Sequence, residues 1–358
     1  MPSKKIKIFL GGFSNSTNAQ NIYCRGLAIN LDKSKFDVYT LQVYSGNLSK
    51  LSNQDTIHVF NCFKPFKFSM YLGFLWGIWK CDVVFLPKSE AWKFNRFLLK
   101  IFKRKSFKTI DGILDEDNLA SAIQTLGNYR NVIEFYNYTD KVFPLTDFLG
   151  KYNSKKHNLD IETKTLYLGC DTKLFQNANL KSSKVNKIVF IGRLMKRKGI
   201  YDYISIAQSF PQIEFNIFGN GEEREAIEEY IKKNNLANVV LRGTLSHEEL
   251  SVFLEEVHLH IFPSRSEGFG LVTLETAAAG IPSLLFDDYG VGEWVSHGLN
   301  GWVVKTKDDM ISILSTLIAN PEQLKKVASE AIQLASSFDW KLRVKAWEDV
   351  IENIFNKQ

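Results

Sequence analysis

Two glutamates on either side of a glycine-rich loop are the residues best suited to bind a polar ligand. Glu267 and Glu275 flank Gly268 to Gly270 and the start of a helix expected at Leu271. Glycines let the backbone come close to a ligand, and a helix start offers unpaired N–H groups and a positive dipole end. That position suits a diphosphate. Because a carboxylate would repel phosphate, we expect the glutamates to accept hydrogen bonds from hydroxyl groups of a sugar ring and a ribose.

The cations for such a ligand are expected from an earlier turn. Residues 192–199, Gly-Arg-Leu-Met-Lys-Arg-Lys-Gly, follow an apolar strand pattern at 187–191. Arg193 and Lys198 therefore stand at the carboxyl end of that strand, where arginine offers a planar fork to phosphate oxygens and lysine a point charge. Taken alone, both residues are also consistent with surface cations at a helix start. The glutamate loop downstream favours the binding interpretation.

Alternating strands and helices are expected to position these residues. In the first half, the strand at 6–10 leads through Gly11-Gly12 into a helix over 21–30, and further strands are predicted at 37–42, 56–60, 82–86, 107–110, 142–144 and 165–168. In the second half, strands are predicted at 187–191, 214–218, 239–242 and 259–262, with helices at 201–209, 222–234 and from 271. This alternation is typical of α/β domains with parallel sheets.

The chain length favours two domains. Its 358 residues are about twice the usual domain length, and the polar stretch at 176–184 is the best linker. We place the domains at 1–178 and 179–338, followed by an amphipathic helix within 339–358. Two doubly wound domains would leave a cleft between the carboxyl ends of their strands, where α/β sheets bind ligands.

At these residues the chain closely resembles the retaining GT-B glycosyltransferases of glycosyltransferase family 4, also described as glycosyl transferases group 1. The resemblance is specific over nearly all of the second half and patchy over the first. The matching pieces are Gly11-Gly12, LGCDTKLF at 168–175, GRLMKRKG at 192–199, FGNGEEREAIEEYI at 218–231, SRSEGFGLVTLE at 264–275 and GEWVSHGLNGWVV at 292–304. It implies two Rossmann-like domains facing across a cleft, with the C-terminal helix crossing back to the first domain.

The resemblance also implies a role for each site residue. Arg193 and Lys198 would hold the donor diphosphate, and Glu267 would contact the transferred sugar. Glu275 would hold the ribose, and Gly12 would approach the phosphate from the first domain. Backbone N–H groups for the sugar and phosphate would come from Gly268, Phe269, Gly270 and Leu271.

The implied reaction is transfer of a sugar from a nucleotide-diphosphate sugar with retained anomeric configuration. The family usually needs no bound metal, and the leaving phosphate helps to deprotonate the acceptor, so that catalysis is mainly positioning and stabilisation of charge on the leaving diphosphate. We expect no cofactor and no metal, and an acceptor such as a lipid-linked glycan or surface-polysaccharide precursor. A nucleotide-sugar epimerase on the same fold and a non-catalytic GT-B subunit are the alternatives.

One departure from the family concerns the first domain. Many members have a histidine after a first-domain strand, in a context like T-x-H, whereas this chain has Asp111 at the apparent position. Two interpretations follow. Asp111 orients an acceptor hydroxyl in place of the histidine, or the alignment of this weakly matching region is offset.

Two other motifs have weaker functional interpretations. Gly219-Asn220-Gly221 imitates a dinucleotide fingerprint, but Arg224 stands where the third glycine would be, which argues against a nicotinamide enzyme. Asp115-Glu116-Asp117 matches the D-x-D pattern of metal-dependent transferases of another fold. An acidic cluster at a helix start is the simpler interpretation of this second motif.

The distribution of charge points to an anionic partner for the first half. Residues 1–178 hold 25 basic and 15 acidic side chains, against 20 and 24 in the remainder. Lys88 to Lys108 contains eight basic residues interleaved with aromatic and aliphatic ones, which is typical of a basic amphipathic helix on an anionic membrane surface. The alternative is that the aromatics pack on the sheet while the cations face water. Nucleic acid is disfavoured, because no recognition motif accompanies the charge.

Cysteine usage and the N-terminus predict the compartment. The four cysteines are widely spaced without a C-x-x-C pair, which fits a reducing environment. The apolar run at 8–10 is too short for a signal-peptide core. We therefore expect a cytoplasmic protein, with peripheral association at the inner face of the cell membrane if the basic segment binds lipid.

Overall fold

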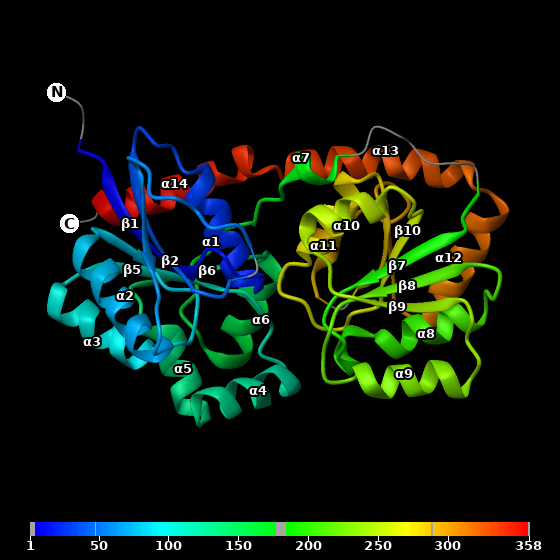
Figure 1. Ribbon diagram of the computed structural model, residues 1–358, viewed down its shortest axis with the longest axis horizontal. Coiled ribbons are helices and arrows are strands. Elements are labelled where there is room, and N and C mark those ends of the chain that lie inside the picture. Colours follow the sequence, from blue (N-terminus) through cyan, green and yellow to red (C-terminus); the bar gives the residue numbers. More distant parts are fainter. Residues whose placement is uncertain (1–3, 47, 177–183, 288, 357–358) are drawn as a thin grey trace. The chain divides into compact units, whose positions relative to one another are not determined.

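A computed structural model of the chain describes residues 4–46, 48–176, 184–287 and 289–356. Its contacts divide the chain into two compact units (Figure 1): unit 1 runs up to Gly169 and resumes at Trp340, and unit 2 is Cys170–Asp339. The predicted boundary at residue 178 lies outside the described residues. Residues before it already belong to unit 2, because the Cys170 N–H donates to the Phe338 carbonyl and Phe175 is buried in the unit 2 core.

Unit 1 is built on a six-stranded sheet in the order β3-β2-β1-β4-β5-β6, with every neighbouring pair parallel. Its strands are mostly apolar and buried, as expected for a parallel sheet covered on both faces. They are β1 (Ile6–Phe13), β2 (Phe36–Gln42), β3 (Ile57–Asn61), β4 (Val83–Phe85), β5 (Lys105–Ile110) and β6 (Lys141–Pro144).

Helices surround this sheet, and the last one comes from the end of the chain. They are α1 (Ala19–Asn30), α2 (Phe66–Lys80), α3 (Trp92–Phe102), α4 (Glu116–Leu126), α5 (Tyr129–Asn137), α6 (Asp147–His157) and α14 (Trp340–Asn356). The Trp340 ring lies so close to Gly26 and Gly169 that a Cβ on either glycine would be 2.4 Å or less from it. Trp347 is fully buried, and its Nε1 donates to the Tyr167 carbonyl at 3.0 Å. These two tryptophans fix α14 on unit 1.

Unit 2 repeats the architecture with the sheet order β12-β11-β10-β7-β8-β9, again with parallel neighbours. The strands are β7 (Lys187–Ile191), β8 (Glu214–Phe218), β9 (Val239–Gly243), β10 (Leu259–Phe262), β11 (Ser283–Phe286) and β12 (Trp302–Val304). The helices are α7 (Thr172–Phe175), α8 (Ile200–Gln208), α9 (Arg224–Lys233), α10 (His247–Leu254), α11 (Leu271–Ala278), α12 (Lys307–Ala319) and α13 (Glu322–Ser337), with short 3₁₀ turns η1 (Lys196–Lys198) and η2 (Val291–Glu293).

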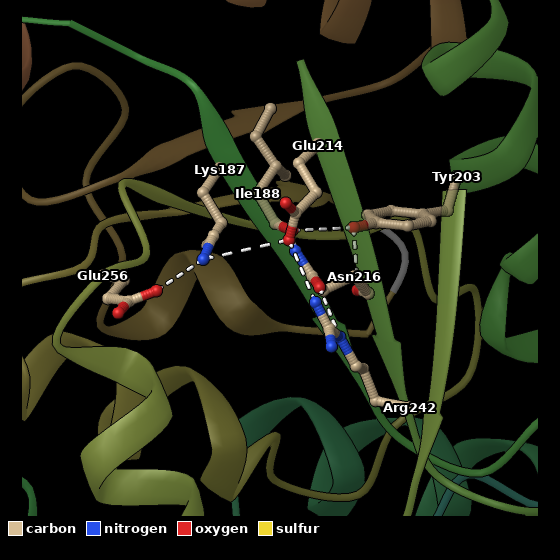
Figure 2. A network of polar contacts seen from close by, with 7 residues as sticks. All are labelled: Lys187, Ile188, Tyr203, Glu214, Asn216, Arg242 and Glu256. Atoms are coloured by element: carbon tan, nitrogen blue, oxygen red, sulfur yellow. Dashed lines mark hydrogen bonds and ion pairs between the residues drawn. The ribbon is translucent and has the colours of Figure 1, made fainter. Parts of the chain in front are cut away.

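A polar network with a buried centre at Asn216 and Tyr203 joins strands β7, β8 and β9 (Figure 2). Asn216 in β8 is fully buried, and its side-chain oxygen accepts a hydrogen bond from Arg242 Nε at 2.9 Å. The Tyr203 hydroxyl lies within hydrogen-bond distance of two carbonyls, those of Asn216 at 2.9 Å and of Ile188 at 3.2 Å. A fully satisfied buried network specifies one register. The three strands therefore form a rigid support for the loops at their carboxyl ends.

Two sequence predictions about unit 1 are wrong. Residues 165–168 form no strand, because only the Glu162 and Leu166 N–H groups donate to β6, at the Val142 and Pro144 carbonyls, and no ladder follows. The Gly11-Gly12 pair does not begin a turn. β1 continues through it to Phe13 with a register break after Leu10. The predicted α/β class with two Rossmann-like units is confirmed.

Candidate functional site

The strand order of unit 2 creates a natural ligand position between β7 and β10. From β7 the chain continues to β8 on one side, whereas β10 is followed by β11 on the other. In open α/β sheets, ligands bind outside the carboxyl ends of the strands at such a switch point. The loops that leave these two strands, residues 192–199 and 263–270, are the two that the sequence singled out.

Backbone contacts lock these two loops to each other. The Arg265 N–H donates to the Arg197 carbonyl at 3.0 Å. Gly199 has a φ of +72°, and a Cβ there would lie 1.9 Å from the Pro263 carbonyl oxygen. Any side chain at this position would therefore push the loops apart, so Gly199 is required by the packing of the site.

Lys198 and Glu267, 69 residues apart in the sequence, form an ion pair across the loops. Lys198 Nζ also donates to the Ser266 carbonyl at 2.8 Å, and the Ser264 hydroxyl donates to Glu267 Oε1 at 3.1 Å. The two charged side chains are only 13% and 15% exposed, so water screens them weakly. An ammonium has three donors, which leaves capacity on Lys198 for a phosphate oxygen.

Arg193 stands apart from this pair, beside a pocket at the carboxyl ends of β7, β8 and β9. Its side chain is exposed and forms no ion pair within the described residues. The pocket has a volume of about 290 Å³ and is lined by Ile191, Gly192, Arg193, Phe218, Gly219, Asn220, Thr244, Leu245 and Leu250. Its wall is mostly apolar and backbone, with one cation at the edge.

Sequence reasoning missed the part of this pocket wall that follows β9. The matching pieces at 192–199 and 218–231 already include Gly192 and Gly219, and with a φ of +140° a Cβ on Gly219 would lie 1.8 Å from the Gly192 carbonyl oxygen. Thr244 and Leu245 were not predicted as site residues. Their position could have identified them, because they directly follow β9, which neighbours β8 in a parallel sheet.

Helix α11 begins at the predicted residue, Leu271, with its N-terminus uncapped by any side chain. Gly270 occupies the N-cap position at a φ of +73°. The first N–H groups of an uncapped helix have no hydrogen-bond acceptor within the helix, and a phosphate oxygen is a suitable acceptor for them. The Phe269 ring is buried and stacks on Trp294 with centroids 4.9 Å apart. The Phe269 ring therefore faces the core, so that the backbone N–H is the only part of Phe269 that suits the predicted donor contact.

Glu275 lies one turn inside α11 and is 8% exposed. Burial raises the pKa of its carboxyl above the ordinary value, and His247, whose Nε2 is 3.7 Å from Glu275 Oε1, acts in the opposite direction. A buried carboxylate with one distant partner retains acceptor capacity for hydroxyl groups. This is consistent with the predicted ribose contact.

Gly12 and Asp111, the two predicted site residues of unit 1, have their own local partners. A Cβ on Gly12 would lie 2.7 Å from Cys24 Sγ of α1, so the close packing of β1 on α1 by itself requires glycine. Asp111 follows β5, and its Oδ2 accepts from Gln20 Nε2 at 2.7 Å and from the Tyr23 hydroxyl at 3.4 Å. Burial raises the pKa of Asp111, against the effect of Gln20. A donor contact by Gly12 remains a prediction.

The predicted basic helix over Lys88 to Lys108 needs correction. Only α3 (Trp92–Phe102) is helical within it. Lys88 is 7% exposed and pairs with Glu90 at 2.8 Å, and Lys108 is fully buried in β5 with its Nζ 3.0 Å from the centre of the Phe135 ring. Burial depresses the pKa of Lys108 strongly. Neither of these two end residues is available to a membrane surface.

The acidic cluster at Asp115-Glu116-Asp117 is the start of α4. Asp115 is the N-cap residue, and its side chain accepts from the Asn118 N–H at 2.8 Å. Glu116 and Asp117 lie in the first turn, where carboxylates interact favourably with the helix dipole. The structure thus confirms the simpler of the two interpretations of this motif.

Known proteins resemble part of this chain in sequence. Residues 171–334 match the family model described as glycosyl transferases group 1. An uncharacterised glycosyltransferase of Methanocaldococcus jannaschii is 27% identical over 62% of this chain and 62% of its own length. A 2-deoxystreptamine N-acetyl-D-glucosaminyltransferase of Niallia circulans is 27% identical over 61% of this chain and 53% of its own length. The match therefore spans less than two thirds of either relative.

Solved structures resemble the chain over both units. Sucrose-phosphate synthase of Thermosynechococcus elongatus superposes with a TM-score of 0.81 at 16% identity, over 99% of this chain and all of that one. HepE of Anabaena, solved with UDP and glucose, gives 0.77 at 16% identity over 97% of this chain and all of that one. None of the helices in the described residues is long and apolar enough to cross a membrane. The chain has the GT-B fold, and residues 171–334 in its second unit match the glycosyl transferases group 1 model.

Proposed function

We propose that the chain is a glycosyltransferase that moves a sugar from a nucleotide-diphosphate sugar to an acceptor with retention of the anomeric configuration. The observation that carries the proposal is the arrangement at the unit 2 switch point. The loops after β7 and β10 contribute the shielded Lys198–Glu267 pair. Helix α11, which follows the second of these loops, contributes its uncapped start and the buried Glu275. Unit 2 also matches the glycosyl transferases group 1 model.

The cationic part of the site suits the leaving group. During transfer, negative charge grows on the diphosphate, and donors already in place stabilise it without reorganisation. We assign this task to Lys198, to Arg193 and to the first N–H groups of α11. Because these groups neutralise the diphosphate, we propose that the reaction requires no metal ion or other cofactor.

The carboxylates suit the hydroxyl groups of the donor. Glu267 is held by Lys198 and Ser264, so its second oxygen has a fixed direction for a sugar hydroxyl. Glu275 is assigned to the ribose, and the pocket of about 290 Å³ beside Arg193 to the nucleoside base. HepE was solved with UDP, which makes UDP the first nucleotide to test.

For the acceptor we propose a lipid-linked glycan or a surface-polysaccharide precursor, bound on unit 1. Asp111 is the proposed residue that orients the acceptor hydroxyl, because it is fixed by Gln20 and Tyr23 beyond the end of β5. Such an acceptor would place the protein at the inner face of the cell membrane.

The test is turnover of UDP-, GDP- and ADP-hexoses, measured as release of the nucleoside diphosphate with and without glycolipid acceptors. We expect release from one donor class that an acceptor accelerates, and a product whose anomeric proton signal shows retention. An isomerised donor without acceptor would indicate an epimerase instead. Binding without turnover for any donor would indicate a non-catalytic subunit, and an inverted product would contradict the retaining mechanism.

A further inference from the structure

Helix α2 has an exposed apolar stripe that no part of the described chain covers. Phe68, Tyr71, Leu75 and Trp79 are spaced by three, four and four residues, which places them on one face, and they are 36% to 57% exposed. The opposite face, with Phe74 and others, is buried on the unit 1 sheet. A helix that is apolar all round is normally buried on all sides. In α2 one side still lacks its apolar partner.

Helix α3 extends this surface. Its Phe97 and Ile101, four residues apart, are 58% and 54% exposed. α3 packs directly on α2, and the Tyr71 and Phe94 rings are in contact with their centroids 5.0 Å apart. We call the six residues Phe68, Tyr71, Leu75, Trp79, Phe97 and Ile101 the α2–α3 face.

A basic pocket lies next to this face, at the C-terminal end of α3. It has a volume of about 410 Å³, and its lining includes Arg96, Lys100, Lys103, Arg104 and Lys105. The acid in its wall is already engaged, because Asp140 Oδ2 accepts from the Ser106 N–H and hydroxyl at 2.7 and 2.9 Å. Arg96 pairs with Glu134 at 3.1 Å, whereas Lys100, Lys103 and Lys105 form no ion pair within the described residues. The pocket is therefore positive and has the donors that a phosphate group binds.

We propose that the α2–α3 face docks on an anionic phospholipid bilayer, with its aromatic side chains at the interface and lipid phosphates in the basic pocket. Charge complementarity selects this occupant. Amphipathic rings such as those of Trp79 and Tyr71 are favoured at the headgroup level, and cations beside them gain from anionic lipids. A second copy of the chain would bring two sets of these cations together, which opposes self-association through this face.

This inference goes beyond the transferase reaction and stands without it, since no residue of the α2–α3 face belongs to the donor site. Nucleotide binding by the same variants therefore serves as a separate readout. A lipid surface beneath unit 1 would raise the local concentration of a lipid-linked acceptor, whichever sugar is transferred.

The experiment is co-sedimentation of the full chain with vesicles of phosphatidylcholine alone or mixed with phosphatidylglycerol, at low and high salt. For the apolar part we choose the double variant Phe68→Ser and Phe97→Ser. For the charge we choose Lys103→Gly, because Lys103 has a φ of +50°, a region that glycine adopts more readily. This variant removes a cation while easing the backbone, so loss of binding cannot be ascribed to unfolding.

We expect binding to the anionic vesicles only, reduced by salt, about fivefold weaker in Lys103→Gly and more strongly weakened in the double serine variant. The matched controls Val252→Ser and Lys326→Ala, exposed positions of unit 2, should bind like wild type. Absence of binding, equal binding to neutral vesicles, or equal losses in the controls would overturn the proposal. So would concentration-dependent self-association that the serine variant abolishes.

Discussion

Units 1 and 2 have the same strand order but different groups at their switch points. In unit 1 the sheet order is β3-β2-β1-β4-β5-β6, and in unit 2, read from the other edge, it is β9-β8-β7-β10-β11-β12. In both sheets the first strand of the unit therefore lies beside the fourth. Beyond β7 and β10 lie Arg193, the shielded Lys198–Glu267 pair and an uncapped helix. In unit 1, Gly12 near the end of β1 is packed on Cys24, and Lys88 beyond β4 is buried against Glu90.

The difference shows that topology provides a position for a ligand, whereas the loops decide what binds there. The family model matches residues 171–334 within unit 2, where Lys198 has a donor left over and the start of α11 has no side-chain cap. In unit 1 the corresponding polar groups mostly satisfy one another. We interpret unit 2 as the general donor-binding half and unit 1 as the half that adapts to the acceptor and its surroundings.

The largest effect should come from Lys198→Met, which removes the shielded cation of unit 2. Loss of one preorganised donor to a developing anion lowers turnover on the order of 10²- to 10³-fold. Nucleoside diphosphate release under saturating donor is the measurement. Lys326→Ala, which removes an exposed lysine of the same unit, is the control for charge alone. An unchanged rate in Lys198→Met would remove Lys198 from the mechanism.

The next largest effect should be a loss of stability when a side chain is added at Gly219, where two backbone segments of unit 2 come close. Gly219→Ala should destabilise unit 2 by about 2–4 kcal/mol, because the new Cβ meets the Gly192 carbonyl and the φ of +140° is unfavourable for alanine. Gly112→Ala in unit 1 has no atom within 4 Å and should change the free energy of unfolding by less than about 0.5 kcal/mol. Chemical unfolding of both variants tests the pair. Equal effects would contradict the described close approach of β7 and β8.

Gly12→Ala should separate packing from ligand contact in unit 1. The clash with Cys24 should lower the free energy of unfolding by about 1–3 kcal/mol. Adding Cys24→Ala removes the sulfur and should restore part of this loss. If the double variant then binds the donor like wild type, glycine is needed only for packing. If stability recovers and donor affinity does not, the predicted contact with phosphate is supported.

The smallest effect should be a change in the pH dependence of stability in Glu275→Gln. Burial raises the folded-state pKa of Glu275, so between its ordinary value of 4.5 and the raised value the native protein binds more protons than the unfolded chain. The free energy of unfolding therefore falls as the pH rises through this window, and the whole loss from burying the charged carboxylate is present above the folded-state pKa. The variant should exceed wild type in free energy of unfolding above neutral pH and match it below about pH 4.5.

Donor affinity gives the second readout for this variant. Loss of a charged hydrogen-bond acceptor should weaken nucleotide binding by about tenfold or more. Glu229→Gln, an exposed position on α9, should alter neither stability nor affinity. A stable variant with normal affinity would show that Glu275 does not hold the ribose.

Local sequence signals predicted strands β7 to β10 of unit 2 and the start of α11 well, but α10 and the elements of unit 2 after α11 were not predicted. The bounds of β7 and β8 and the start of α11 agree with the prediction, because apolar runs there are interrupted by glycines whose conformations end the elements. Residues 165–168 have an equally apolar pattern but lack a neighbouring ladder, and no local rule reveals that.

Contacts between segments that are distant in the chain could not be predicted from the sequence. The Lys198–Glu267 pair joins residues from two loops, and composition could not show that they touch. In the sequence Lys108 resembles a surface cation in a basic run. In the structure its position on strand β5 directs its side chain between the rings of Phe135 and Tyr138. The exposed stripe of α2 could not be recognised from the sequence, because the spacing of apolar residues does not distinguish a side that faces the sheet from one that nothing covers.

The most direct test of the difference between the units is calorimetric titration of UDP into wild type, Lys198→Met and Lys88→Met. The two variants remove one shielded lysine each from the corresponding switch points. Our account predicts that Lys198→Met weakens binding by about tenfold or more, as expected for a charged hydrogen bond, while Lys88→Met stays within about twofold of wild type. Equal weakening in both variants, or none in Lys198→Met, would contradict the assignment of the donor site to unit 2.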